Sequence, residues 1–365
     1  MSADGFEKQD RDLSEDRVRV REAAFRICEW YAASRRMLPW RQDPTPYRTW
    51  IVEIMLQQTR IEAVIPYYAR FLEELPDVPS LAAVSEDRLL KLWEGLGYYS
   101  RARNLKKAAV QLAEKYGGEL PASAEELRKL PGIGDYTAGA IASIAFGLPE
   151  PAVDGNVLRV VTRLLACPED IAKAPARRKT ADLLRDAYPA GKEAGILTEG
   201  IMELGETVCL PNAVPRCGVC PLRTLCLAHL AGEELSYPVK SAPGKRRTEQ
   251  KTVFLLDCEG RFALRRRDDR GLLAGLWEFP NAEGQLTAQE AVRQVSDWGL
   301  RAEDIAFCGE AKHIFTHVEW QMTGYLVHCT EAAGSFQWCS PEEIDSLYSL
   351  PTAFRYYREK TRRVI

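Results

Sequence analysis

The sequence has no long apolar run, no export signal and no excess of positive charge. No segment approaches the ~20 consecutive apolar residues of a membrane span, and residues 1–17 are charged rather than apolar. The formal net charge is −3, which excludes a chain that coats DNA through uniform positive charge. We therefore expect a soluble, cytoplasmic protein without a membrane partner, and any nucleic-acid surface must be local.

The chain is long for a single core and rich in cysteine. Its 365 residues predict two domains. Four of its ten cysteines, Cys209, Cys217, Cys220 and Cys226, cluster on one short segment, which without an export signal favours metal binding over disulfides. Four thiolates on one loop suit a 4Fe-4S cluster. Zinc is the rival, but a zinc ribbon usually has two Cys-x-x-Cys knuckles, and only Cys217 and Cys220 form one.

A glycine hairpin joins two predicted helices. Ser123 and Glu126 have capping-box spacing for a short helix, which a Pro-Gly-Ile-Gly run ends. The next helix, 136–146, consists largely of small residues, so its backbone can approach a neighbour closely. Gly132 and Gly134 leave backbone N–H groups free to bind phosphate oxygens at the start of that helix. The alternative is an ordinary glycine-rich turn between helices.

Two carboxylates lie in contrasting local settings. Glu53 is the one carboxylate of a predicted helix, 50–60, that is apolar on most sides. Burial would raise its pKa and keep it protonated near neutrality, as a general acid requires. Gln57 and Arg60 share its helical face, however, so periodicity alone predicts an exposed side chain. Asp154 is expected as the N-cap of the helix that follows it, which would lower its pKa and keep it ionised.

The C-terminal third follows a basic linker. Residues 236–250 are rich in proline, glycine, lysine and arginine without apolar periodicity, which indicates a linker. Its basic run has two readings, a contact with DNA or a solvated segment, and the second is favoured. Beyond it, two alternating strands meet at a Glu-Gly turn as a hairpin, and Thr287 and Ser340 each begin a helix at capping-box spacing. Strands and helices in this order predict an α+β domain over residues 251–365.

These motifs, in this order, resemble one family. The run LPGIGDYTAGAI, followed by VDGNV, is similar to the helix-hairpin-helix DNA glycosylases and most of all to the MutY-type adenine DNA glycosylases. The segment EIMLQQTR resembles that family's signature around its catalytic glutamate, and GLWEFPN resembles its Nudix-like C-terminal domain. The resemblance covers residues from about 20 to the C-terminus. It departs at 210–216, where the first gap between cysteines has seven residues instead of six.

The resemblance implies a catalytic set. Glu53 would protonate the adenine, Asp154 would stabilise a positively charged sugar, and Asn156 would orient the attacking water. Tyr136 would pack beside the reacting centre. The endonuclease III-like branch has a lysine at this position that forms a Schiff base, which a phenol cannot do because imine formation needs an amine. The resemblance therefore implies a monofunctional enzyme.

The resemblance also implies contacts with DNA, in the adenine pocket, at the oxidised guanine, along the backbone and by intercalation. The candidate substrate-binding residues are Arg36, Trp40, Arg41, Gln58, Thr59, Tyr98, Gly132, Gly134, Glu199, Phe315, Thr316 and His317. Trp40 in isolation is equally consistent with a tryptophan packed on the core, and Tyr99 is expected to pack at a helix end. A metal site at His313 and His317 is disfavoured because no further ligand lies nearby in sequence.

Two further expectations concern the metal segment and the C-terminal domain. The cluster would be structural and would present Arg216 and Arg223 to DNA phosphates. Arg293, Ser296 and Asp297 stand where a Nudix hydrolase needs carboxylates for magnesium, so we expect recognition rather than hydrolysis there.

These observations predict a mobile tail at 1–16, a mainly α helix-hairpin-helix glycosylase domain at 17–235 with a 4Fe-4S loop at 209–226, a linker at 236–250 and a Nudix-like α+β domain at 251–365. We expect a monomeric, monofunctional adenine DNA glycosylase of base excision repair. It would act on double-stranded DNA with A:8-oxoguanine or A:G mispairs, by base flipping and acid catalysis.

Two alternatives remain open at this point. An endonuclease III-like glycosylase/lyase is disfavoured by Tyr136. A non-catalytic iron-sulfur DNA-binding protein is disfavoured by the presence of both Glu53 and Asp154.

Overall fold

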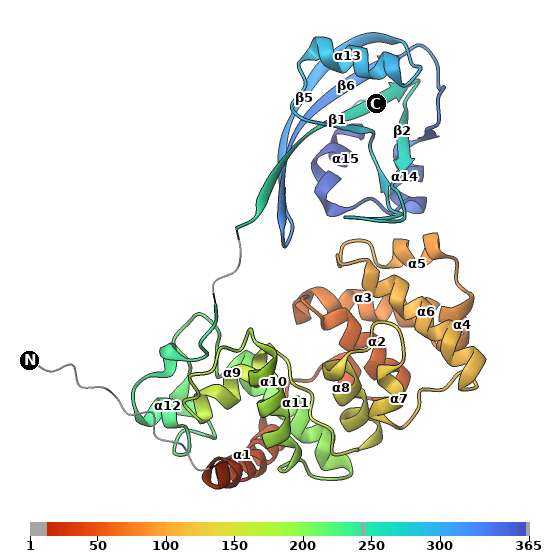
Figure 1. Cartoon of the computed structure of the whole chain (residues 1–365). Helices are drawn as coiled ribbons and strands as arrows, with labels where there is room; N and C mark the ends of the chain where they lie inside the picture. Colours follow the sequence, from red (N-terminus) through yellow and green to blue (C-terminus); the bar gives the residue numbers. More distant parts are fainter. Residues whose placement is uncertain (1–12, 242–244, 363–365) are drawn as a thin grey trace, which may run out of the picture. The chain divides into compact units, whose positions relative to one another are not determined.

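The computed structural model describes residues 13–241 and 245–362, and the structural statements below refer to these residues. Within them the chain forms two compact units (Figure 1). The first comprises residues 13–82 and 107–241, and the second comprises residues 83–106 and 245–362. The sequence analysis assigns residues 83–106 to the first domain, whereas the structure groups them with the second unit.

The first unit is helical, as predicted. Its α-helices are α1 (Leu13–Ser34), α2 (Pro46–Leu56), α3 (Ile61–Glu74), α4 (Val78–Ala83), α6 (Ser100–Lys115), α7 (Ala124–Arg128), α8 (Asp135–Phe146), α9 (Gly155–Leu164), α10 (Ala174–Arg185), α11 (Lys192–Thr207) and α12 (Leu227–Leu230). Its short 3-10 helices are η1 (Pro39–Arg41), η2 (Cys217–Val219) and η3 (Glu234–Ser236). Helices α4 and α6 continue across the boundaries between the units.

Helix α2 lies in the interior of the first unit. Eight of its eleven residues are buried, among them Glu53, so a side chain on this helix is withdrawn from water on almost every face. The helix ends at Leu56, and residues 57–60 form a turn. The helix predicted for 50–60 is therefore too long by one turn. Periodicity alone, which counted that extra turn, predicts an exposed Glu53 and is wrong, whereas the acid that the resemblance implies requires the burial that the structure shows.

The glycine hairpin forms as predicted, with one difference at the cap. Ser123 caps α7 by accepting a bond from the Glu126 N–H. The Glu126 carboxylate accepts a 2.9 Å bond from the Tyr116 hydroxyl and also pairs with a lysine, so it does not close a capping box. Gly132 has a φ of +81°, a left-handed conformation that favours glycine, and Gly134 is the N-cap of α8.

The small residues of α8 allow close backbone approach on two sides. A Cβ atom at Gly139 would lie 2.3 Å from the Pro151 carbonyl oxygen, so the segment before α9 runs directly against the helix. On α11, a Cβ atom at Gly195 would lie 3.0 Å from the Ile144 Cα. Helix α8 is thus held between the strand-like segment that leads to Asp154 and helix α11, as the run of small residues predicts.

The second unit combines one helix from the middle of the chain with a sheet and further helices. Its helices are α5 (Glu86–Leu92), α13 (Ala288–Asp297), α14 (Pro341–Leu347) and α15 (Arg355–Thr361), with the 3-10 helix η4 (Thr352–Phe354). Its strands are β1 (Arg247–Cys258), β2 (Arg261–Arg266), β3 (Trp277–Glu278), β4 (Asn281–Glu283), β5 (Ala302–Ile314), β6 (Val318–Cys329) and β7 (Gln337–Cys339).

The strands form one mixed sheet in the order β3-β2-β1-β6-β5, with β4 paired to β1 and β7 to β2. Only the β1–β6 pair among these is parallel. The predicted hairpin is confirmed, because Asp257 pairs with Phe262 and Cys258 with Arg261 across the Glu-Gly turn. Helices cover both faces of the sheet, α13 on one and α14 and α15 on the other (Figure 1). The predicted α+β architecture is confirmed.

The capping predictions in this unit are confirmed as well. Thr287 and Glu290 form a full capping box at the start of α13, and Ser340 and Glu343 form one at the start of α14. Such boxes satisfy two backbone donors within four residues, so they depend on local sequence alone.

Two boundaries differ from the predictions. Helix α1 begins at Leu13, so the tail predicted for 1–16 is wrong for its last four residues, and the rest of the tail lies outside the described residues. Strand β1 begins at Arg247, so the predicted linker ends earlier than 250, and residues 242–244 within it are not described.

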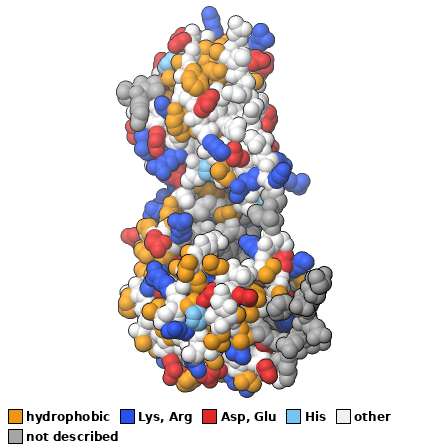
Figure 2. Space-filling model, turned by 90° about the vertical axis from the view of Figure 1, so that its left-hand side faces the viewer, with side chains coloured by type: hydrophobic (Ala, Val, Ile, Leu, Met, Phe, Trp, Pro, Cys, Tyr) orange, Lys and Arg blue, Asp and Glu red, His pale blue; other side chains and the backbone are white. Residues whose placement is uncertain are grey.

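No helix within the described ranges is long and apolar enough to cross a membrane. On the face drawn in Figure 2, lysine and arginine side chains are interspersed with aspartate and glutamate, in keeping with the small net charge.

Candidate active site

A cavity of about 400 Å³ opens on the first unit, a size typical of sites for small ligands or single chemical groups. Its lining residues are Leu38, Trp40, Arg41, Glu53, Leu56, Gln58, Thr59, Arg60, Ile61, Tyr136, Asp154, Asn156, Glu199, Met202, Glu203 and Glu206. The structure therefore brings together all four predicted catalytic residues. It adds five of the predicted substrate-binding residues, Trp40, Arg41, Gln58, Thr59 and Glu199.

Glu53 is almost fully buried, and among the acids that line this cavity Glu203 alone is less exposed. The Glu53 side chain comes from the interior helix α2, and the residue is only 5% exposed. Burial raises its pKa to about 7, while a hydrogen bond from Tyr136 acts in the opposite direction. That bond runs from the Tyr136 hydroxyl to Glu53 Oε2 and measures 2.5 Å. A carboxyl in this setting is largely protonated just below neutral pH.

Tyr136 stands in the first turn of α8, directly after the glycine hairpin. Burial raises the pKa of its phenol well above the ordinary value, and the neighbouring Glu53 raises it further. The phenol therefore keeps its proton and acts as a hydrogen-bond donor to the carboxyl group.

Asp154 caps α9, as predicted. Its Oδ1 accepts a 2.7 Å bond from the Val157 N–H, and its Oδ2 accepts a 3.0 Å bond from Asn156 Nδ2. Burial nevertheless raises its pKa, and these bonds and the charge of Arg159 only oppose the rise. The predicted lowering is therefore wrong, because the burial of this carboxyl outweighs the favourable helix N-terminus.

Arg159 is a buried residue of the site that the sequence analysis missed. Its Nη2 donates to Asn156 Oδ1 at 2.8 Å and to the Gly205 carbonyl at 2.6 Å, and its Nε donates to the Cys209 carbonyl at 2.7 Å. It thus joins the amide beside Asp154 to the start of the cysteine segment. An arginine on an otherwise apolar stretch of α9 is the signal that could have identified it.

A second set of charges lines the same cavity. Arg41 Nη2 donates to Glu203 at 2.9 Å, and Arg41 Nε lies 3.4 Å from Glu199 Oε1. Glu199 Oε2 also accepts a 2.9 Å bond from the Tyr31 hydroxyl. Arg36 does not line the cavity but donates to Glu203 at 2.5 Å and 3.0 Å, so it supports the wall from behind. Glu203 is a second residue that the sequence analysis missed.

Trp40 lies in η1 and fulfils both of the roles considered for it. It is buried, and its ring packs edge-on against Tyr68 with centroids 5.5 Å apart, yet it also lines the cavity. The two roles are compatible, because one part of the Trp40 ring packs against the core while another part lines the cavity.

The turn after α2 brings Gln58 and Thr59 to the mouth of the cavity. Gln58 has a φ of +58°, an uncommon conformation for a residue other than glycine. The preceding Gln57 donates from Nε2 to Thr137 Oγ1 at 3.1 Å, which ties the turn to the first residues of α8. The exposed hairpin glycines Gly132 and Gly134 lie just before that helix and outside the cavity lining.

The four clustered cysteines border one small cavity of the first unit. Cys209, Cys217, Cys220 and Cys226 line it together with Arg163, His229 and Glu234. Arg163 Nη1 donates to Cys209 Sγ at 3.2 Å, and the Cys226 thiol donates to the Arg163 carbonyl at 3.3 Å. All four are free thiols that line one small cavity, and four sulfur ligands in one place fit an iron-sulfur cluster.

A mixed ligand set occurs at the same place. Cys217, His229 and Glu234 bring three potential ligand atoms within 4.8 Å of one another, an arrangement that zinc could use. Arg216 and Arg223 are exposed on this segment, as predicted for residues that meet phosphates.

In the second unit the structure brings together two predicted DNA contacts that lie far apart in sequence. Tyr98 is 47% exposed, and its hydroxyl lies 3.1 Å from Thr316 Oγ1. Thr316 and His317 are exposed in the turn between β5 and β6. Phe315 instead packs against Trp320, with ring centroids 4.9 Å apart, so it anchors the turn. Tyr99 is buried, as expected for a packed tyrosine.

Residues of the second unit that were considered as metal ligands make other contacts. The His313 ring packs edge-on against the Phe315 ring, with centroids 4.5 Å apart. On α13 the carboxylate of Glu290 is engaged in the capping box, and Arg293, Ser296 and Asp297 follow it.

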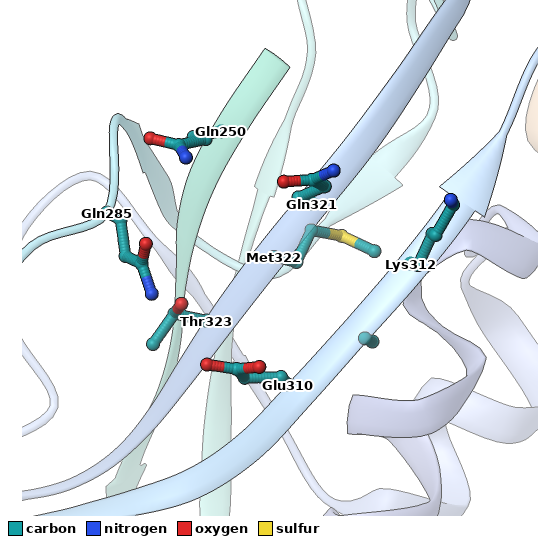
Figure 3. Close-up of a pocket in the computed structure, with 8 residues that line it drawn as sticks. Gln250, Gln285, Glu310, Lys312, Gln321, Met322 and Thr323 are labelled. Carbon is teal, nitrogen blue, oxygen red and sulfur yellow. The ribbon is translucent and has the colours of Figure 1, made fainter. Parts of the chain in front are cut away.

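A second cavity, of about 360 Å³, lies over strands β1, β5 and β6 of the second unit. Figure 3 shows Gln250 of β1, Glu310 and Lys312 of β5, and Gln321 and Thr323 of β6 around it. Six of its eight lining residues are polar or charged, and none of the predicted site residues is among them.

Comparison with known proteins covers both units. Residues 51–186 match the HhH-GPD superfamily of base excision DNA repair proteins, and residues 252–360 match the NUDIX domain. The adenine DNA glycosylase of Rattus norvegicus is 32% identical, over 93% of this chain and 79% of the relative. That of Homo sapiens is 32% identical over 92% and 74%, and that of Buchnera aphidicola subsp. Baizongia pistaciae is 33% identical over 80% and 82%.

Two solved structures share the helical architecture. A thermostable thymine-DNA glycosylase is 25% identical with a TM-score of 0.53, over 60% of this chain and 100% of that chain. A non-covalent complex of Endonuclease III with DNA is 27% identical with a TM-score of 0.50, over 60% and 97%.

The raised pKa of Glu53 can be tested through protein stability. A carboxyl with a pKa of 4.5 in the unfolded chain and about 7 in the folded protein contributes stability that is complete below pH 4.5 and is lost as the pH rises to about 7. Glu53→Gln has no such loss. We expect its free energy of unfolding to rise relative to the wild type over this window, by up to about 3 kcal/mol, and to keep that advantage above it. Urea denaturation at a series of pH values measures this.

The exposed Glu62 provides a matched control, since Glu62→Gln should leave the pH dependence unchanged. Parallel stability curves for Glu53→Gln and the wild type would show that the Glu53 pKa is not raised.

Proposed function

The chain belongs to the adenine DNA glycosylase family, and we propose that it removes adenine mispaired with 8-oxoguanine or guanine from double-stranded DNA. The observation that carries this proposal is the buried carboxyl of Glu53, hydrogen-bonded to Tyr136, at a cavity that also holds Asp154. A carboxyl that stays protonated near neutrality suits the protonation of a base that must leave its sugar.

The adenine has to leave the base stack to reach this cavity. Extrusion of a base costs a few kcal/mol, and the cost is lower at a mispair, which favours mispaired adenine from the start. Trp40 and the charged wall of Arg41 and Glu199 would then enclose the base.

Glu53 and Asp154 divide the chemistry between them. The Glu53 carboxyl gives its proton to adenine N7, so that the glycosidic bond can break with its electron pair on the base. Asp154, as a carboxylate, stabilises the positive sugar that remains, in the manner of paired carboxylates in glycosidases. Asp154 loses its proton before Glu53 does, because its carboxylate accepts two hydrogen bonds, one from a backbone N–H and one from an amide. Glu53 accepts a single bond, from a phenol.

Asn156 and Arg159 complete the catalytic side of the cavity. The Asn156 amide donates to Asp154, and Arg159 holds that amide through its oxygen, which leaves the group oriented to help place the attacking water. The sugar then gains a hydroxyl from water, and the proton that this water releases passes to the carboxylate of Glu53, which restores the acid.

The cavity favours a monofunctional enzyme. A lyase needs an amine that forms an imine with the sugar, and no lysine is among the residues that line this cavity. Tyr136 occupies the position after the hairpin instead.

The rest of the DNA would be held by groups around the cavity. The hairpin of Gly132 and Gly134 would bind phosphate oxygens through backbone N–H groups, and Gln58 and Thr59 would enter the duplex. In the second unit, Tyr98, Thr316 and His317 would contact the base opposite the adenine, with Phe315 as the anchor of their turn.

The four cysteines would hold a 4Fe-4S cluster. Such a cluster would hold the loop 209–226 in one shape, and nothing in its chemistry contributes to glycosidic cleavage. Arg163 would hold Cys209 in place through its hydrogen bond to the sulfur, and the segment would present Arg216 and Arg223 to DNA phosphates.

A duplex with a central A:8-oxoguanine pair tests the proposed activity and its two rivals. We expect strand cleavage only after alkali, because a monofunctional glycosylase leaves an intact strand with an abasic site. Cleavage without alkali would indicate a lyase, and an intact strand under both conditions would indicate a binding protein.

Glu53→Gln should lower the single-turnover rate of adenine release by at least about 100-fold, since general acid catalysis contributes 10²–10⁴-fold. Affinity for the mispaired duplex should change little. The wild-type rate should also fall as the pH rises above about 7, because Glu53 then loses its proton. Glu62→Gln should keep the wild-type rate, and a fast Glu53→Gln enzyme would remove this residue from the mechanism.

Metal content distinguishes the cluster from zinc. The purified protein should be brown and contain about four iron atoms per chain. Cys226→Ser should lose the iron, whereas Cys167→Ser should retain it, because Cys167 lies outside the cysteine cavity. A colourless protein with stoichiometric zinc would contradict the cluster and favour the set of Cys217, His229 and Glu234.

Thr316→Val tests recognition of the opposite base. It removes the exposed hydroxyl and keeps the shape of the side chain, so the preference for A:8-oxoguanine over A:G should fall about tenfold, as expected for the loss of one contact to a base edge. Single-turnover rates on the two duplexes measure this ratio. Thr330→Val, also exposed, is the matched control, and an unchanged ratio for Thr316→Val would place recognition elsewhere.

A further inference from the structure

Glu94 is a carboxylate at the centre of a network of charges within the second unit. Its side chain is 15% exposed. Its Oε1 accepts a 2.9 Å bond from Arg358 Nη1 and a 3.1 Å bond from the Leu350 N–H, and its Oε2 accepts a 2.7 Å bond from Lys91 Nζ. Both oxygens are therefore engaged, and two of the three donors come from the C-terminal part of the chain.

The network continues from Glu94 into α14 and α15. Lys91 Nζ also donates to the Tyr348 carbonyl at 2.9 Å. Arg358 donates from Nε to Asp345 Oδ1 at 2.6 Å. Loss of one partner from a largely buried network leaves an uncompensated charge, which costs far more than the loss of an exposed ion pair. The network therefore ties the segment after α5 firmly to these helices.

The loop that follows Glu94 is strained. Gly95 and Gly97 have φ values of +104° and +70°, and Tyr98 has a φ of +47° although it is not glycine. Such a conformation persists only where the surroundings hold it in place. Arg101 provides part of that support, because its Nη2 donates to the Leu96 and Gly97 carbonyls at 2.9 Å and 3.1 Å.

Two more contacts connect the segment to the rest of the second unit. Arg103 donates to the Ala274 carbonyl at 2.6 Å. At the other end, the Tyr98 hydroxyl meets Thr316 at 3.1 Å. The exposed phenol is thus held in one place, beside the turn between β5 and β6.

We infer that Glu94 and Arg358 are positioning residues for Tyr98. Their ion pair fixes the start of the strained loop, so that Tyr98 and Thr316 present one joint surface to the strand opposite the adenine. The C-terminal helices would then serve recognition without touching DNA. This inference rests on the proposed role of Tyr98 and Thr316 in DNA binding, but the order of the loop can be measured without DNA.

Hydrogen exchange of the full-length protein tests the positioning directly. Arg358→Gln removes the charge that pairs with Glu94, and we expect backbone amides of residues 95–100 to exchange about tenfold faster or more, as for an opened buried ion pair. Residues 46–56, around Glu53, should be unaffected. Arg355→Gln is the matched control on the same helix, since Arg355 is 79% exposed and its one ion pair within the described residues is with Glu359. Equal exchange in Arg358→Gln and the control would overturn the inference.

A double-mutant cycle adds a test that a general loss of stability cannot mimic. Glu94→Gln keeps the shape of the side chain, and if the pair acts as one unit, the double variant should exchange no faster at residues 95–100 than the faster single variant. Additive effects would overturn the inference.

The same variants separate this inference from the proposed function. Arg358→Gln should lower the preference for A:8-oxoguanine over A:G by about the same factor as Thr316→Val, roughly tenfold, and leave adenine release at saturating enzyme unchanged. Faster exchange with an unchanged preference would refute the DNA role of Tyr98, while the positioning by Glu94 and Arg358 would stand.

Discussion

The withdrawal of the Glu53 carboxyl from water is the constraint on which the catalytic unit depends. A carboxylate in such a place would be costly, so the group keeps its proton at pH values where an exposed glutamate has lost it. To serve as an acid, such a carboxyl must stand on an interior helix and lie next to a cavity that the substrate can enter. It also needs a hydrogen-bond donor that keeps its own proton and orients the carboxyl group. Helix α2, the phenol of Tyr136 and the surrounding helices meet these three requirements.

The Tyr136 hydroxyl, on α8, reaches Glu53 because neighbouring segments pack unusually closely around that helix. The backbone before Asp154 approaches Gly139 of α8 more closely than any side chain at that position would allow. Gly195 of α11 allows that helix to approach α8 closely from another side. The same close packing therefore places Tyr136 against the acid and Asp154 at the edge of the same cavity. Small residues contribute little burial energy of their own, but they decide how near the reactive groups can come.

Two carboxylates that are largely withdrawn from water show a common way of holding side chains in place. In the first unit Glu203 binds the guanidinium groups of Arg36 and Arg41 at the cavity. In the second unit Glu94 binds Lys91 and Arg358 beside the Tyr98 loop. In both cases the charges are mutually satisfied, so removal of one would leave the others unpaired. The result is rigid support for neighbouring groups that face the substrate.

The sequence by itself determined the local features: the hairpin, the helix caps and the cap position of Asp154, because each depends on a few adjacent residues. Motif resemblance supplied the family and the candidate residues. Only the tertiary structure decided that Glu53 is buried against Tyr136, 83 positions away, and that Arg159 joins Asn156 to the cysteine segment. It also reversed the expected pKa of Asp154. Burial and long-range hydrogen bonds depend on which distant segments pack together, and neither periodicity nor spacing within one helix contains that information.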